Sequence, residues 1–137
     1  MSFSVAVLDE VDHGGLPAER ATELCAAAFS ARGYDPDSLG EVSVALVDRE
    51  TIHELNLEYR GKDAPTDVLS FEIDGPYGEM VGEIVICPGV SSSEMPIEEL
   101  VVHGALHLSG MDHGEDFEAS EMALAQEKVL RTTGGGG

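Results

Sequence analysis

Apolar and polar or small residues alternate in four short stretches of this 137-residue chain, which predicts four β-strands. These stretches are residues 3–8, 41–47, 67–73 and 81–87. The second stretch is apolar at nearly every position, so that strand is predicted to be buried on both faces. A Gly-Pro-Tyr-Gly turn at 75–78 separates the last two strands and predicts that they pair as a hairpin.

Between and after the strands, apolar residues recur every three to four positions, which predicts helices. Pro17 suits the first position of a helix that ends at Gly33. Asp48 is a suitable N-cap for a short helix that carries Ile52, Leu55 and Tyr59. A third helix is predicted from about residue 94 to 109, and a last one follows residue 113. Two or more helices on one small sheet define an α+β fold.

The length fits one domain, predicted over residues 1–133, with the four glycines at 134–137 as a tail. No apolar run approaches the ~20 residues that a membrane span needs, and the first residues lack the features of a signal peptide. Cys25 and Cys87 lie in apolar surroundings and are predicted to be buried free thiols. We therefore expect a cytoplasmic protein that does not bind membranes.

Three of the five histidines fall within eleven residues, at His103, His107 and His113. A spacing of four places the first two on one face of a helix, about one turn of ~5.4 Å apart. Gly110 can end the helix in a left-handed conformation, so that the chain returns and brings His113 to the same point. Three imidazoles with a vacant fourth position are typical of a catalytic zinc site. The alternative is a chance pair of histidines on an ordinary helix.

The same histidine spacing and return glycine occur in the metzincin peptidases, whose signature is H-E-x-x-H-x-x-G-x-x-H. In that signature a glutamate follows the first histidine and acts as general base. Here that position is Gly104. The pattern therefore predicts the metal site, with one zinc ion per chain, without the peptidase base. A metallopeptidase remains an alternative function.

The chain carries 27 acidic and only seven basic residues, for a net charge of −20. Such a surface repels phosphate backbones at long range, whereas nucleic-acid-binding proteins usually carry a basic patch. Two of the few cations, Arg60 and Lys62, lie in one loop. The planar guanidinium of arginine suits phosphate or carboxylate oxygens, so both residues are candidates for substrate binding. Ion pairing with Glu58 or Asp63 is an equally good interpretation of the spacing.

Three segments resemble the YbeY family of bacterial endoribonucleases and occur in the family's order. They are residues 56–71, residues 82–87 and the histidine stretch 103–113. The similarity extends over essentially the whole chain, and the first and third segments are highly specific. The resemblance implies a zinc-dependent, single-strand-specific endoribonuclease. The family acts in ribosomal RNA maturation, notably at the 3′ end of the small-subunit RNA, and in ribosome quality control.

Carried over position by position, the resemblance implies that His103, His107 and His113 bind the metal and that Arg60 is catalytic. His103 is also counted among the catalytic residues, and Lys62 remains a candidate for substrate binding. The expected partners are single-stranded ribosomal RNA and the small ribosomal subunit or its assembly proteins. Neither DNA nor a membrane is expected. Because the chain is so acidic, a protein partner on the ribosome is one way to deliver the RNA.

The predicted chemistry leaves two nucleophiles open, a metal-activated water and the ribose 2′-OH. They give different ends, so a 2′,3′-cyclic phosphate product excludes direct attack by water. Asp67 and Asp112 are candidate carboxylates near the metal, and each also suits an ordinary turn or cap. A non-catalytic ribosome-assembly factor with a structural zinc is a further alternative.

Overall fold

A computed structural model of the chain describes residues 3–11, 16–35, 41–74, 80–88, 97–109 and 121–132, which form four strands and four helices. In chain order these are β1 (Val5–Asp9), α1 (Ala18–Ala31), β2 (Val42–Leu46), α2 (Arg49–Arg60), β3 (Val68–Asp74), β4 (Met80–Ile86), α3 (Ile97–Leu108) and α4 (Glu121–Thr132). All four predicted strands are present, shifted by no more than two residues at either end. The predicted turn at 75–78 and the glycine tail lie outside the described residues.

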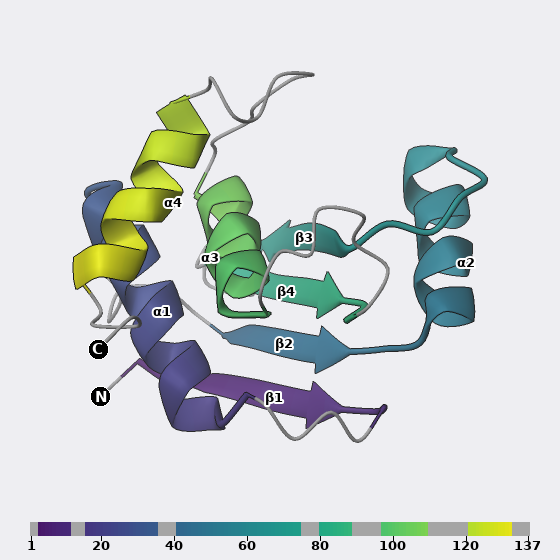
Figure 1. Cartoon of the computed structure of the whole chain (residues 1–137), viewed down its shortest axis with the longest axis horizontal. Helices are drawn as coiled ribbons and strands as arrows, with labels where there is room; N and C mark the ends of the chain where they lie inside the picture. The colour runs from purple at the N-terminus through teal and green to yellow at the C-terminus, as the bar shows by residue number, and fades with distance from the viewer. Residues whose placement is uncertain are drawn as a thin grey trace.

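The four strands form one mixed sheet in the order β1-β2-β4-β3 (Figure 1). β2 runs parallel to both β1 and β4, and its residue Val42 lies opposite Val5 on one side and Gly82 on the other. β3 and β4 are antiparallel, with Val68 opposite Ile86. The predicted α+β class with a small mixed four-stranded sheet is confirmed.

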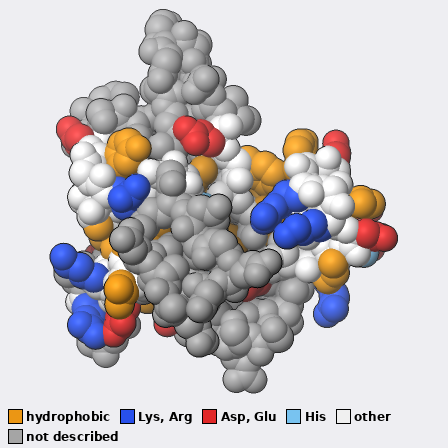
Figure 2. All heavy atoms as spheres, turned by 90° about the horizontal axis from the view of Figure 1, so that it is seen from above, with side chains coloured by type: hydrophobic (Ala, Val, Ile, Leu, Met, Phe, Trp, Pro, Cys, Tyr) orange, Lys and Arg blue, Asp and Glu red, His pale blue; other side chains and the backbone are white. Residues whose placement is uncertain are grey.

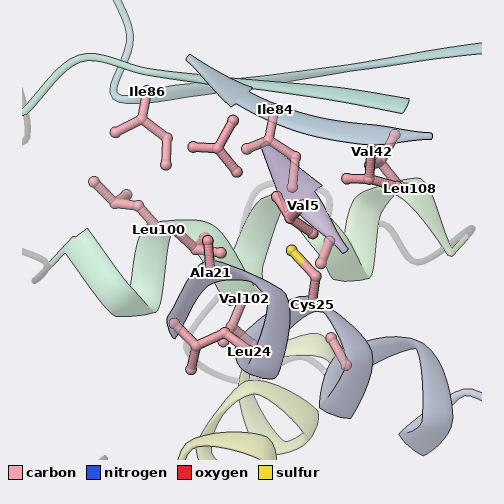
Figure 3. Close-up of a cluster of buried hydrophobic side chains, with 14 of the residues drawn as sticks. Val5, Ala21, Leu24, Cys25, Val42, Ile84, Ile86, Leu100, Val102 and Leu108 are labelled. Carbon is pink, nitrogen blue, oxygen red and sulfur yellow. The ribbon is translucent and has the colours of Figure 1, made fainter. Parts of the chain in front are cut away.

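Helices α1, α3 and α4 pack together on one face of the sheet (Figure 1). Their apolar side chains meet those of alternate strand residues, such as Val5, Val42 and Ile84, in the main core (Figure 3). Because side chains alternate along a strand, the intervening residues point to the opposite face. The main core therefore contains the interior face of α3, the helix that carries the histidine pair.

Helix α2 covers part of the opposite face. Ile52 is fully buried in a second cluster that includes Ala45 of β2, Val85 of β4 and Val47, which follows β2. β2 thus contributes side chains to both cores, as its nearly continuous apolar sequence predicts.

The cysteines lie in different cores, Cys25 in the main core and Cys87 in the second cluster, and both are buried and free as predicted. Burial raises the pKa of the Cys25 thiol to about 12. It also raises the pKa of Cys87, with a further contribution from nearby Asp48. Neither sulfur is therefore a thiolate at neutral pH, and both act as small apolar side chains.

Local signals account for the starts of α1 and α2. Asp48 is the N-cap of α2, and its Oδ1 accepts a hydrogen bond of 2.8 Å from the backbone N–H of Thr51. Pro17 is the N-cap of α1 rather than its first helical residue, because its backbone is extended. Its carbonyl still accepts the first helical hydrogen bond, from Ala21. Of the helix predicted over residues 94–109, the structure describes Ile97–Leu108 as helical, and residues 89–96 lie outside the description.

Candidate functional site on the histidine helix

The rings of His103 and His107 lie together on α3, with ring centroids 4.8 Å apart and an angle of 65° between their planes. This is the arrangement that a spacing of four residues predicts for a helix. His103 is buried, with 8% of its surface exposed, and His107 is half-buried. The pair therefore sits at the boundary between the core and the surface, where one ring is held by packing and the other is open to solvent.

A glutamine that the sequence analysis did not single out contacts the first histidine. Nδ1 of His103 lies 3.2 Å from Oε1 of Gln126, which comes from α4 and is itself buried. An amide oxygen only accepts hydrogen bonds, so in this arrangement Nδ1 carries the ring proton and Nε2 has the lone pair. A single buried glutamine on an amphipathic helix is a weak signal in a sequence, because only the packing of α4 on α3 identifies its partner.

Two glycines allow α3 to approach the sheet closely. A Cβ on Gly104 would lie 2.5 Å from Cγ2 of Ile84, and a Cβ on Gly82 would lie 2.7 Å from Cδ1 of Leu108. Position 104 thus faces β4. Residues 103 and 107 lie one helical turn apart on a neighbouring side of α3. This close approach sets where the two imidazoles stand relative to the sheet.

The same helix is tied to neighbouring elements by polar contacts. The hydroxyl of Ser70 on β3 donates a hydrogen bond of 3.0 Å to the carbonyl of Gly104. At the end of α3, Ser109 accepts a hydrogen bond at its Oγ from Nε of Arg32 and one at its carbonyl from the hydroxyl of Tyr34, both 3.3 Å long. The histidine helix is thus held at its middle by the sheet and at its end by the residues that follow α1.

The two histidines that the structure describes could supply two of the three protein ligands of a zinc site. Imidazole is a common zinc ligand, and a ligating histidine usually donates its other ring N–H to an oxygen, as His103 does to Gln126. The third predicted ligand, His113, and the candidate carboxylate Asp112 lie outside the described residues. In the part of the chain that the structure does describe, no group of three or more histidine, cysteine, aspartate or glutamate side chains could hold a metal ion.

Arg60 and Lys62 lie on either side of the residue that ends α2. Gly61 is the C-cap with a φ of 69°, a left-handed conformation that glycine adopts without strain, and both neighbouring side chains are exposed. Within the described residues, no hydrogen bond or ion pair joins Arg60 or Lys62 to His103 or His107. The structure therefore places these cations on the surface without bringing them into contact with the histidine pair.

The ion pairs that the sequence left open for Arg60 and Lys62 are not found among the described residues. Asp63 instead contacts His53, with 2.6 Å between Oδ1 and Nε2. His53 therefore connects α2 to the loop that follows it. Asp67, the other candidate carboxylate, is half-buried at the end of this loop, and its backbone carbonyl accepts a hydrogen bond from Cys87.

Asn56 also holds the loop that follows α2. Its Nδ2 donates a hydrogen bond of 2.8 Å to the carbonyl of Ala64, and its own carbonyl accepts one from the backbone N–H of Lys62. Only 3% of Asn56 is exposed. A polar residue on the buried side of an amphipathic helix is the signal in the sequence that identifies it. Together with the His53–Asp63 contact, these bonds hold the loop in one conformation.

Comparison with known proteins identifies the family. The family model described as Endoribonuclease YbeY matches residues 16–134. The chain belongs to the YbeY family. It is 68% identical to the protein named Endoribonuclease YbeY of Rubrobacter xylanophilus over 136 residues, which are 98% of this chain and 99% of that protein. A solution structure of TM1509 from Thermotoga maritima shares 29% identity with a TM-score of 0.57, covering 96% of this chain and 90% of that one.

The match to the YbeY family confirms the resemblance seen in the sequence, and it includes α2, β3, β4 and the histidine helix. Membership alone does not assign a role to any residue of this chain. Among the described helices, none combines the length and apolar composition that crossing a membrane requires.

Proposed function

We propose that this YbeY protein is a zinc-dependent endoribonuclease that cleaves single-stranded RNA during ribosomal RNA maturation and ribosome quality control. The observation that carries the proposal is the pair of rings of His103 and His107 on one helix, with Nδ1 of His103 hydrogen-bonded to Gln126. The name of the Rubrobacter xylanophilus relative, Endoribonuclease YbeY, supports RNA as the substrate class.

In this proposal His103, His107 and His113 hold one zinc ion. When bound, the ion supplies Lewis acidity toward a phosphodiester oxygen and toward water. Gln126 keeps the His103 ring in place, and the contacts of α3 with Ser70 and Ile84 prevent the helix from shifting. The protein thus contributes a site whose two described imidazoles are oriented before substrate arrives.

Arg60 is the cation assigned to the phosphate. A guanidinium offers two parallel N–H donors to phosphate oxygens and stays charged at every physiological pH. Arg60 is exposed, and no ion pair in the described residues occupies it, so its charge is available to an incoming strand. Lys62, two residues further on, extends the same charge along the loop.

The packing of Gly104 argues against the peptidase alternative. In the metzincin signature a glutamate at this position acts as the general base. Here the position faces Ile84 and Ser70, each within 3.2 Å or less of where a Cβ would stand. A glutamate side chain at 104 would therefore point into the sheet and away from the flank that carries the imidazoles.

The test combines metal analysis with a comparison of two RNA substrates. We expect the purified protein to contain one zinc ion per chain and to cleave a single-stranded RNA much faster than the same strand in a duplex. Loss of cleavage on removal of zinc, and its return on adding zinc back, would complete the assignment. Equal cleavage of casein, or full RNA cleavage by metal-free protein, would contradict the proposal. Stoichiometric zinc without cleavage would instead indicate an assembly factor with a structural metal.

A further inference from the structure

Three of the seven basic residues of the chain, Arg49, Arg60 and Lys62, lie on α2 and the loop after it. Figure 2 shows basic side chains at the end of the molecule where α2 lies, and others at the opposite end. All three are exposed, and none takes part in an ion pair within the described ranges, whereas Arg20 and Arg131 are paired with glutamates. In a chain with a net charge of −20, exposed basic residues without an ion pair are the groups available to contact a polyanion.

Helical geometry separates these cations from the acidic residues of α2. Arg49 and Arg60 are eleven residues apart, about three turns, so their side chains leave the helix in similar directions. The glutamates of α2, at positions 50, 54 and 58, are spaced by four and lie on a neighbouring flank. The two arginines of α2 therefore lie apart from its glutamates, even though the helix is acidic overall.

An aromatic ring lies beside the cationic end of α2. Tyr59 is 61% exposed, and its ring meets that of Phe71 on β3 edge to face, with 5.0 Å between the ring centroids. Phe71 is half-buried in the second core cluster and so provides a rigid support for Tyr59. The tyrosine thus presents most of its ring to solvent in a held orientation, directly before Arg60 in the chain.

The loop that carries Lys62 is also held before any ligand binds. The His53–Asp63 contact and the two Asn56 bonds fix its path, and the N–H of Ala64 bonds to the carbonyl of Lys62 at 2.9 Å. A binding surface that is already ordered loses less conformational entropy when it binds.

We infer that Tyr59, supported by Phe71, stacks against an unpaired base of single-stranded RNA while Arg60 and Lys62 contact the adjoining phosphates. A combination of aromatic side chains and a positively charged track is the general means of binding single strands, and each stacked base contributes about 1–3 kcal/mol. The inference rests on the proposed function, because it assumes that RNA is the substrate. It adds a base-binding residue that neither the histidine motif nor the arginine supplies.

Binding of a short, single-stranded RNA to metal-free protein tests the inference without cleavage. Fluorescence anisotropy gives the Kd, and quenching of a 2-aminopurine base reports stacking. We expect Tyr59→Ala to weaken binding about tenfold and to abolish the quenching, whereas Tyr59→Phe keeps both. Leu124→Ala, which truncates an exposed side chain on α4, is the matched control and should bind like the wild type.

The salt dependence of RNA binding distinguishes contacts with phosphates from stacking on a base. Replacing Lys62 with glutamine should reduce the slope of log K against log salt by about 0.7, whereas Tyr59→Ala should leave the slope unchanged. If the wild type binds RNA and Tyr59→Ala binds equally well with the same quenching, the inference is wrong while the proposed function stands. If the wild type neither binds nor cleaves RNA, both are wrong.

A second inference comes from the buried contact between His103 and Gln126. The geometry points to Gln126 as a positioning residue that keeps the proton of His103 on Nδ1 and leaves Nε2 as the metal-binding nitrogen. Both residues are at least nine-tenths buried, so a change in either one removes a hydrogen bond from the core. This inference also rests on the proposed zinc site, and it concerns a residue on a different helix from the ligands.

Its test compares Gln126→Leu, which keeps the side-chain volume without an acceptor, with Gln126→Glu, which keeps the acceptor. Nitrogen-15 NMR of histidine-labelled, metal-free protein should show His103 protonated on Nδ1 in the wild type and in Gln126→Glu, but not in Gln126→Leu. Zinc affinity should fall about 10- to 100-fold in Gln126→Leu and recover in Gln126→Glu.

Unchanged tautomer and unchanged zinc affinity in Gln126→Leu would overturn this inference. A wild-type protein that binds no zinc would overturn the proposed function and the positioning role together. In that case the NMR measurement would still report whether the His103–Gln126 contact exists in solution.

Discussion

Gly104 of α3 and Ile84 of β4 stand so close that a Cβ on the glycine would lie 2.5 Å from Cγ2 of the isoleucine. The contact sets the depth at which the histidine helix packs on the sheet. The branched isoleucine is fully buried and cannot swing away. The distance between α3 and β4 therefore depends on the absence of a side chain at position 104.

Gly104→Ala should consequently destabilise the protein even though alanine favours helices. The gain in helix propensity is about 1 kcal/mol, and overpacking a core costs about 1–3 kcal/mol. Gly82→Ala is the matched comparison, because its nearest contact is the flexible end of Leu108. The difference between overpacking and helix propensity is a net loss of up to about 2 kcal/mol for Gly104→Ala, and we expect a smaller effect for Gly82→Ala, as measured by urea unfolding. Equal stabilities for the two variants would show that α3 can move away from β4.

His107→Ala should remove stoichiometric zinc and RNA cleavage together, because a zinc site that loses one of three protein ligands loses most of its affinity. His53→Ala is the control for metal content, since His53 lies on α2 and contacts Asp63. Elemental analysis of both purified variants provides the measurement. Full zinc occupancy in His107→Ala would remove this residue from the ligand set.

Arg60→Ala should keep its zinc and lose cleavage about 10²–10³-fold, the usual effect of removing a group that stabilises charge in a transition state. Arg131→Ala provides a control on another exposed arginine, which pairs with Glu127 on α4. Single-turnover cleavage of a single-stranded RNA distinguishes the two variants. Normal turnover by Arg60→Ala would make Arg60 an ordinary surface residue.

Glu98 at the start of α3 makes part of the stability dependent on pH. Its Oε1 accepts a hydrogen bond of 2.8 Å from Nη2 of Arg20 on α1, and this bond lowers the pKa of Glu98 below its usual range. A lowered pKa in the folded protein stabilises the fold above the unfolded pKa of about 4.3, and this contribution disappears as the pH falls through the folded value. The pair is partly exposed, so we expect a contribution under about 1 kcal/mol.

Comparing the wild type with Glu98→Gln at several pH values isolates this contribution, because the repulsion among the other acidic residues is common to both proteins. The difference in unfolding free energy should be constant near neutral pH, begin to fall near the unfolded pKa of about 4.3, and vanish below the lowered pKa of the folded protein. A difference that grows on acidification would have the wrong sign for a carboxylate stabilised by Arg20.

Local patterns in the sequence were sufficient for several features. The alternation of residues predicted all four strands, and the nearly continuous apolar run of β2 predicted its burial on both faces. Asp48 was predicted and found as the N-cap of α2. The position of Pro17 was wrong by one residue, because proline suits both the cap and the first turn.

In the candidate site, too, some features follow from local sequence and others from tertiary packing. A spacing of four residues was enough to place His103 and His107 together, since the period of a helix is a local property. Gln126 is 23 residues from His103, and its role depends on how α4 packs on α3. The contact of His53 with Asp63 likewise depends on the turn that the chain makes at Gly61.

The sequence by itself determined the elements, their buried faces, the family and the pairing of two imidazoles, because each depends on residues that are near neighbours or on motifs of fixed spacing. Only the tertiary structure decided the strand order β1-β2-β4-β3, the contact of Gln126 with His103 and the close approach of Gly104 to Ile84. Those relationships join residues distant in the chain. They follow from how whole helices and strands pack, and no local pattern records that packing.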